Sequence, residues 1–146
     1  MNQTDLILHV ENEPDDVFIV QRAMKKLGIT NPTVHVENGE LAVDYLSGCI
    51  PITDKTEHRL PSLILLDLSM PRMGGIEVLR WIRSQPIIKR IIVVVLTSSQ
   101  NQDDITAAYD NGANGYLVKP VGMPEFQAVL ASMKTFWLEA NHGPSY

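Results

Sequence analysis

A run of four consecutive apolar residues, Leu63 to Leu66, ends directly in an acid, Asp67. An uninterrupted apolar run of this length predicts a strand that is buried on both faces, as in a parallel sheet covered by helices on each side. Asp67 then lies at the carboxyl end of that strand, which is the edge of an open α/β sheet where ligands bind. A carboxylate is costly to desolvate there unless a cation or a reaction partner accounts for it. An acid in this position can also be a helix cap or a loop residue.

Three other predominantly apolar runs end in polar side chains of complementary chemistry. Ile91–Leu96 precedes the hydroxyl of Thr97, and Gly115–Val118 precedes Lys119. The first run, Leu6–Val10, precedes an acidic turn. If these strands are parallel neighbours, acids, a hydroxyl and an ammonium meet at one edge of the sheet. Carboxylates bind a hard ion such as Mg²⁺, and an ammonium and a hydroxyl bind phosphate oxygens. The pattern therefore indicates a site for a divalent cation and a phosphoryl group.

Helical and strand patterns alternate five times along the chain, which is typical of an α/β fold with a doubly wound parallel sheet. The expected helices begin at Pro14, Glu40, Gly75, a capping box formed by Ser99 and Gln102, and Pro124. Residues 49–61 form the one long connection, which is either a functional loop or a tolerated surface insertion. A chain of 146 residues has the size of one domain. We therefore expect a single domain over 1–146, in which the fifth helix extends over about 134–146.

Composition excludes several classes of protein. A net charge of −5 argues against direct binding to nucleic acid, which requires a basic surface. The chain has neither an apolar run long enough to cross a membrane nor the features of a signal peptide. Its only cysteine, Cys49, cannot form an internal disulfide. These features are consistent with a soluble protein of the cytoplasm.

The acidic turn Glu11–Asn12, the segment Asp67–Pro71, Thr97 and the pair Lys119–Pro120 together resemble the receiver domain of two-component response regulators. The spacings of 30 residues from Asp67 to Thr97 and 22 from Thr97 to Lys119 also match that family. A narrower likeness, carried by the segment ILHVENEPDD and the terminal FWLEA, is to the single-domain regulators that partner phytochromes. The resemblance implies a flavodoxin-like receiver fold with strand order 2-1-3-4-5 and five helices.

The resemblance also implies a function and its residues. Asp67 is expected to accept a phosphoryl group from a histidine kinase, such as a phytochrome, so that the chain is a signalling protein rather than an enzyme. Mg²⁺ is expected to be the cofactor, held by Glu11, Asn12, Asp67 and the backbone carbonyl of Ser69. Phosphate-binding and switch roles fall to Thr97, Ser98, Lys119 and Tyr116, and a cis peptide bond is expected between Lys119 and Pro120. From the residues alone, Lys119 could instead be a surface lysine and Tyr116 a packed aromatic.

One position departs from the family pattern. Asn12 stands where the family usually has a second acid, and an amide oxygen binds Mg²⁺ without the negative charge that a hard cation favours. The alternative function is therefore a phosphate-independent interaction module with weakened metal binding. A phosphohydrolase similar to haloacid dehalogenase-like enzymes would need a second acid two residues after Asp67, where this chain has Ser69.

Two large aromatic residues, Phe136 and Trp137, lie near the end of the fifth helix. They form either a local lid over the core or part of an interface, where aromatic residues are enriched. Resemblance to the phytochrome-associated regulators favours a homodimer across the fourth helix, fifth strand and fifth helix. Tyr109 and Tyr116 would then lie in or near the dimer contact, together with Phe136 and Trp137.

Overall fold

The structure is a computed structural model that describes residues 1–50 and 58–145. Its sheet consists of β1 (Ile7–Val10), β2 (Thr33–Val36), β3 (Leu63–Leu66), β4 (Ile92–Thr97) and β5 (Gly115–Val118). Neighbouring strands are parallel and their order is β2-β1-β3-β4-β5. The fold expected from the sequence, a doubly wound parallel sheet of the flavodoxin-like type, is thus confirmed.

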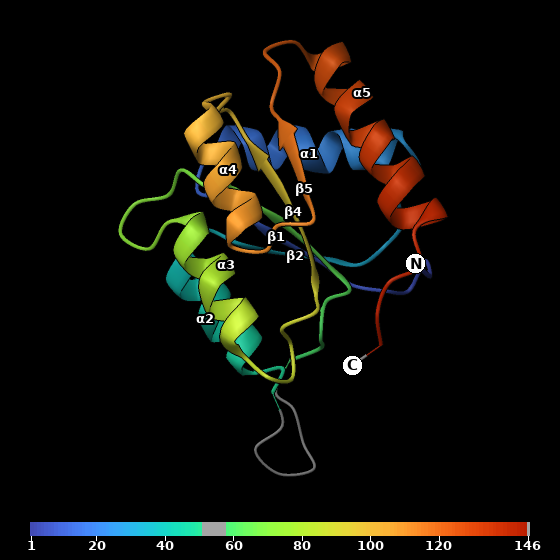
Figure 1. Cartoon of the computed structure of the whole chain (residues 1–146). Helices are drawn as coiled ribbons and strands as arrows, with labels where there is room; N and C mark the ends of the chain where they lie inside the picture. Colours follow the sequence, from blue (N-terminus) through green and yellow to red (C-terminus); the bar gives the residue numbers. More distant parts are fainter. Residues whose placement is uncertain (51–57, 146) are drawn as a thin grey trace.

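Helices cover both faces of the sheet (Figure 1). One face carries α1 (Pro14–Lys26) and α5 (Met123–Met133), and the other carries α2 (Gly39–Ser47), α3 (Gly75–Ser84) and α4 (Gln102–Asp110). Within the described ranges, no helix combines the length and the apolar character needed to cross a membrane.

The apolar run of β3 packs into both layers. Leu63 and Leu65 join the cluster that contains residues of α1 and α5, whereas Ile64 and Leu66 join the cluster that contains residues of α2 and α3. All four side chains are at most 1% exposed. Burying a leucine or isoleucine completely contributes roughly 1.5–3 kcal/mol, so this strand anchors both layers.

Local signals in the sequence explain most helix ends. Pro14 is the first residue of α1, acids lie in the first turn, and Gly28 follows the helix with a φ of 72°. The capping box expected for α4 is wrong. Asn101 is the N-cap, and its side chain accepts a hydrogen bond from the Asp103 amide, whereas Ser99 Oγ accepts one from the Asn101 amide. Asn101 takes the cap because it lies directly before the first helical residue.

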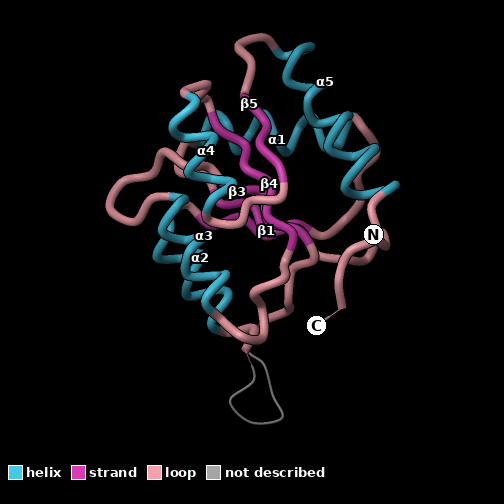
Figure 2. The backbone as a smooth tube through the Cα atoms, viewed as in Figure 1, coloured by secondary structure: helices cyan, strands magenta, loops and turns pink. Residues whose placement is uncertain are grey.

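The carboxyl-terminal part of the chain departs from the expected long helix. Helix α5 continues into a π-helix, η1 (Lys134–Ala140), and residues 141–145 are not helical. The expectation of a helical extension over about 134–146 is therefore wrong for residues 141–145, and residue 146 lies outside the described residues. Gly143 and Pro144 explain this end, because glycine and proline are the least favourable residues in a helix. The tube in Figure 2 shows the segment after η1 running as a loop.

Most of the long connection expected over 49–61 lies outside the described residues, which omit 51–57. Its two ends are held on α2. The His58 amide donates to the Gly48 carbonyl at 2.9 Å, and the His58 ring stacks on Tyr45 at 4.6 Å between ring centroids. The Tyr45 hydroxyl donates to the Arg59 carbonyl at 2.7 Å. The connection therefore leaves and rejoins the fold at the same end of α2.

Candidate functional site

The strand register brings four strand ends to one edge of the sheet. Val10 of β1 pairs with Leu66 of β3, so Glu11 and Asp67 follow these strands side by side. The Asp67 amide donates to the carbonyl of Val10 at 3.1 Å. On the other side of β3, the Lys119 amide donates to the carbonyl of Thr97 at 2.8 Å. Parallel pairing thus gathers the acidic turn, Asp67, Thr97 and Lys119, as the sequence indicates.

Lys119 is the centre of this edge. Its ammonium donates hydrogen bonds to Glu11 Oε1 and to Asp16 Oδ2, the latter at 3.0 Å, and lies 3.7 Å from Asp67 Oδ2. The side chains of Glu11, Asp67 and Lys119 are at most 5% exposed. Lys119 is therefore not a surface lysine, because its charge is buried among carboxylates.

Burial and charge oppose one another in the pKa values of this cluster. Burial raises the pKa of Glu11 to about 7, with Asp67 adding to the rise, although the hydrogen bond from Lys119 works against it. For Lys119, burial alone would lower the pKa. The surrounding carboxylates Glu11, Asp67 and Asp16 outweigh burial and raise the pKa of Lys119 above its ordinary value. The ammonium therefore stays charged, and the proton that the cluster exchanges near neutral pH belongs to Glu11.

The peptide bond between Lys119 and Pro120 is trans, since the described residues contain no cis peptide bond. The expected cis bond is therefore wrong in this structure. No cis bond is needed to aim the lysine inward, because the long Lys119 side chain reaches Glu11, Asp16 and Asp67 from a trans bond. The trans form of a bond before proline is also favoured by roughly 0.5–1 kcal/mol.

The loop after β3 packs closely around Asp67. The Ser69 amide lies 3.4 Å from Asp67 Oδ1, which accepts its hydrogen bond, and the Ser69 side chain is exposed. At Gly75, the first residue of α3, a Cβ atom would come within 2.3 Å of the Asp67 carbonyl oxygen. Only glycine permits this approach, so Gly75 fixes how α3 docks against the acidic strand end.

Two buried oxygens at this edge have no hydrogen-bond partner. They are Asn12 Oδ1 and Thr97 Oγ1, and among the described residues only one other buried side-chain oxygen, on Glu40, is in the same condition. A buried polar atom without a partner costs roughly 1–3 kcal/mol, which is tolerated where a ligand satisfies it. Asn12 Oδ1 fits a hard cation, and the Thr97 hydroxyl fits a phosphoryl oxygen.

The donor set nevertheless does not form a finished metal site. No group of three histidine, cysteine, aspartate or glutamate side chains in the described part of the chain has the arrangement to hold a metal ion. The reason is visible in the contacts, because the carboxylates of Glu11, Asp16 and Asp67 point to Lys119. Metal binding at this edge requires that some of these carboxylates turn away from the ammonium.

The hydroxyl groups after β4 differ in their surroundings. Thr97 is fully buried, whereas Ser98 is exposed. Tyr116 of β5 is partly buried and its hydroxyl donates to the Ser99 carbonyl at 3.0 Å. Burial raises the pKa of Tyr116 above its ordinary value. Tyr116 is thus tied to the segment directly after Thr97.

The two aromatic residues near the end of the chain have different roles. Trp137 packs over Gly115, where a Cβ atom would lie 3.2 Å from the indole ring, and it belongs to the partly buried shell of the core. Phe136 is 52% exposed and meets Trp137 edge-on at 4.7 Å between ring centroids. Tyr109 of α4 is also exposed, at 50%. Trp137 is therefore the local lid, and Phe136 and Tyr109 remain candidates for an interface.

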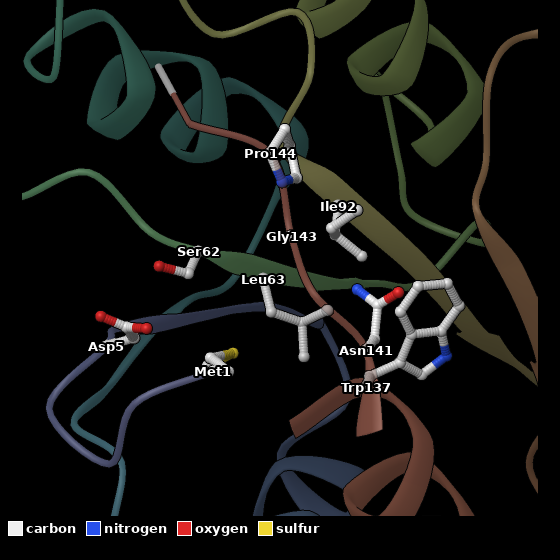
Figure 3. Close-up of a pocket in the computed structure, with 9 residues that line it drawn as sticks. All are labelled: Met1, Asp5, Ser62, Leu63, Ile92, Trp137, Asn141, Gly143 and Pro144. Atoms are coloured by element: carbon white, nitrogen blue, oxygen red, sulfur yellow. The ribbon is translucent and has the colours of Figure 1, made fainter. Parts of the chain in front are cut away.

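The opposite edge of the sheet carries a hollow of about 140 Å³ (Figure 3). It lies at the amino ends of β3 and β4, where Leu63 and Ile92 begin their strands, and the segment after η1 closes it with Gly143 and Pro144. Of the site and interface residues predicted from the sequence, only Trp137 lines it. The cavity and the charged cluster are therefore separate features at opposite ends of the strands.

One site residue, Asp16, is not apparent from the sequence pattern. It lies in the first turn of α1, where an acid is favourable beside the helix amino terminus for any function. Its contact with Lys119 depends on how α1 docks against the sheet edge. The one available signal is position, because a helix that comes directly after the acidic turn begins at the same edge.

Comparison with known proteins identifies the family. Residues 7–131 match the response regulator receiver domain. The chain therefore belongs to the receiver domains of response regulators, which act in two-component signalling. Response regulator Rcp1 from Synechocystis sp. is 36% identical over 138 residues, which cover 94% of this chain and 92% of Rcp1. A probable methanogenesis regulatory protein, FilR2 from Methanothrix harundinacea, is 34% identical over 95% of this chain and 87% of FilR2.

Solved structures of response regulators, one of them from a phytochrome pathway by its name, resemble the chain over nearly its whole length. The Mn²⁺-bound form of Rcp1 has a TM-score of 0.85 at 35% identity, and the match covers 97% of this chain and 99% of Rcp1. The phosphorylated cyanobacterial phytochrome response regulator RcpA has a TM-score of 0.85 at 34% identity, again over 97% and 99% of the two chains. The chain is thus similar to response regulators of phytochromes throughout its length.

Proposed function

We propose that this chain is a single-domain response regulator, spanning 1–146, that accepts a phosphoryl group on Asp67 from a histidine kinase and signals by changing its partners. The observation that carries this proposal is the buried cluster at the carboxyl edge of the sheet. It combines an acceptor carboxylate, Asp67, with a charged ammonium, Lys119, and two buried oxygens that have no hydrogen-bond partner. Such groups are costly to a fold unless a ligand uses them.

The proposed transfer is an in-line displacement at phosphorus. A carboxylate oxygen of Asp67 forms the new P–O bond while the P–N bond of the donor phosphohistidine breaks, and the imidazole leaves with the electron pair. The product on this chain is an acyl phosphate. Lys119 neutralises a phosphoryl oxygen, and the burial of Asp67 and Lys119 keeps water from the reacting atoms.

Mg²⁺ is the proposed cofactor, and the residues that would hold it are Glu11, Asn12, Asp67 and the backbone carbonyl of Ser69. When bound, the ion neutralises charge that develops on the transferring phosphoryl oxygens. The unpartnered Asn12 Oδ1 supports its place among the ligands. The Mn²⁺-bound structure of Rcp1 supports a divalent cation in this group of proteins.

The proposed switch lies between Thr97 and Tyr116. The Thr97 hydroxyl, buried without a partner, moves toward the phosphoryl group, and Tyr116 moves into the space that it leaves. The Tyr116 hydroxyl must then exchange its bond to the Ser99 carbonyl. Because Tyr116 lies on β5 beside α4, the change is transmitted to the surface formed by α4, β5 and α5. Ser98 is the proposed second hydroxyl for the phosphoryl group, from the exposed side.

The proposal is tested by incubating the protein with acetyl phosphate and Mg²⁺ and measuring the intact mass. The wild-type protein should gain one phosphoryl group, Asp67→Asn should gain none, and the control Asp110→Asn on the exposed surface of α4 should behave as wild type. If the wild-type protein gains no phosphoryl group from either acetyl phosphate or a phosphorylated histidine kinase, the phosphate-independent interaction module is the better interpretation.

We further propose a phytochrome-type kinase as the donor and a homodimer across α4, β5 and α5. The similarity to RcpA supports the first, and the exposed rings of Phe136 and Tyr109 support the second. Phe136→Ala should shift sedimentation toward monomer, whereas Phe18→Ala, which removes an exposed ring from α1, should not. A wild-type protein that sediments as a monomer at high micromolar concentration, phosphorylated or not, would exclude the dimer.

A further inference from the structure

Asp16 occupies a position that the proposed transfer does not yet use. It is the third residue of α1, its side chain is 26% exposed, and its Oδ2 accepts a hydrogen bond from the Lys119 ammonium at 3.0 Å. Glu11 and Asp67, the other two carboxylates around Lys119, are both proposed metal ligands. Asp16 is therefore the one carboxylate on Lys119 that can stay in place when a cation binds.

The net charge of the cluster shows why the carboxylate of Asp16 matters for binding a divalent cation. Asn12 contributes an oxygen but no charge, and that oxygen is buried without a partner. When ionised, the three carboxylates of Glu11, Asp16 and Asp67 exceed the one ammonium of Lys119 by two negative charges, which equals the charge of a divalent cation. Without Asp16 the excess is one. The cluster then resembles a site in which an acid at position 12 has been lost and not replaced.

The contacts of Lys119 also favour a role for Asp16 in cation binding. When Glu11 and Asp67 turn to a cation, the ammonium loses two of its three acidic partners and would repel the dication. Asp16 keeps the ammonium neutralised and holds it beside Asp67. The first turn of a helix favours this carboxylate, because the unpaired amides and the helix dipole there stabilise negative charge.

We propose that Asp16 is a positioning residue that supplies, from the first turn of α1, the negative charge that Asn12 lacks, and thereby sets the Mg²⁺ affinity of the receiver. This inference rests on the proposed function, since it concerns the same site. In this role Asp16 acts electrostatically, on the cation and on the Lys119 ammonium, and takes no part in bond formation.

Calorimetric titration with MgCl₂ tests the inference on four proteins: wild type, Asp16→Asn, Asp15→Asn and the double variant Asn12→Asp/Asp16→Asn. Asp15 is the matched control, because it lies in the same first turn and is exposed. Asp16→Asn should weaken Mg²⁺ binding about tenfold, the scale of one unit charge acting on a dication a few ångströms away. Asp15→Asn should stay within about twofold of wild type. The double variant, which moves the charge from position 16 to position 12, should recover most of the lost affinity.

The outcomes separate this inference from the proposed function. Equal Mg²⁺ affinities for wild type and Asp16→Asn would overturn the role of Asp16 and leave phosphorylation at Asp67 untouched. Weakened binding that the double variant does not recover would also overturn it, because Asp16 would then act through structure rather than charge. Thermal unfolding of each variant checks the fold, and Asp16→Ser, which removes the charge with a smaller side chain, replaces Asp16→Asn if that variant unfolds. A wild-type protein that binds no Mg²⁺ would remove the proposed function and this inference together.

Discussion

Two cations, Lys119 and Arg83, lie at opposite ends of the strands, and the hydrogen bonds that they make to the described residues differ in kind. Lys119 is held by carboxylates at the carboxyl edge. The guanidinium of Arg83 donates at the amino edge to neutral oxygens, at 2.7 to 3.0 Å: the carbonyls of Lys89, Ile91 and Gly112, and Oδ1 of Asn114. Carbonyls that complete a turn cannot leave without breaking the backbone arrangement. Carboxylates can turn to another cation. The partners of the positive charge are therefore fixed at the amino edge and exchangeable at the carboxyl edge.

The polar groups around these cations show the same difference. At the amino edge, Asn114 Oδ1 accepts from Arg83 and also from the Val93 amide at 2.8 Å, so its bonding capacity is used. At the carboxyl edge, Asn12 Oδ1 and Thr97 Oγ1 are buried without a partner. The first edge is organised for stability and the second retains polar groups that a ligand would satisfy.

The largest expected effect is on stability at the amino edge. Arg83→Met should lower the free energy of unfolding by about 3 kcal/mol, because the partly buried carbonyl oxygens of Ile91 and Gly112 lose their donor at once. Urea denaturation measures this change. The control Arg80→Met removes an exposed arginine with one bond to Asn111 at 3.2 Å and should cost less than about 0.5 kcal/mol. If the two variants were equally stable, the contrast between the two edges would fail.

The second effect is a pH dependence confined to the carboxyl edge. The pKa of Glu11 is raised from 4.5 to about 7. The contribution of Glu11 to the free energy of unfolding is therefore fully present below pH 4.5 and is lost as the pH rises through about 7. Mg²⁺ binding requires the ionised carboxylate, so the Mg²⁺ affinity should rise as the pH rises. Affinity should be about tenfold weaker at pH 6 than at pH 8, as titration at the two pH values would measure. Glu11→Gln should remove this dependence, and an unchanged slope in that variant would assign the proton to another group.

The smallest expected effect is an increase in stability rather than a loss. Thr97→Val replaces a buried hydroxyl that has no partner with a methyl group of the same shape, so it should stabilise the protein by about 1 kcal/mol. Thr106→Val, at an exposed position of α4, is the matched control and should change the unfolding free energy by less than about 0.5 kcal/mol. A marked loss of stability in Thr97→Val, measured by thermal or urea unfolding, would show that the hydroxyl is already bonded.

The strands and their edge were predictable because both depend on apolar runs and on the polar residues directly after each run. Leu63–Leu66 packs into both layers as a buried strand should, and parallel pairing alone gathers Asp67, Thr97 and Lys119. The family resemblance, on the same residues, was confirmed by the match over residues 7–131. Periodicity and strand ends are therefore sufficient for the fold and the centre of the site.

Features that depend on docking or on competing local bonds were not predictable. Asp16 reaches Lys119 only because of the way α1 meets the sheet. Ser99 and Asn101 both have capping side chains, and their difference of two positions decides which one caps α4. The pair Phe136 and Trp137 looks uniform in sequence, yet the packing of Trp137 over Gly115 leaves only Phe136 largely exposed. Each of these requires the placement of one element on another.

The assignment of Asp67 as the phosphoacceptor is tested most directly by locating the phosphoryl group. The protein is phosphorylated in Mg²⁺, reduced with borohydride, which converts an aspartyl phosphate to homoserine, and digested for peptide mass spectrometry. The modification should appear at Asp67 and should be absent when a chelator replaces Mg²⁺. Reduction at Glu11 or at Asp16, with Asp67 unchanged, would contradict the assignment.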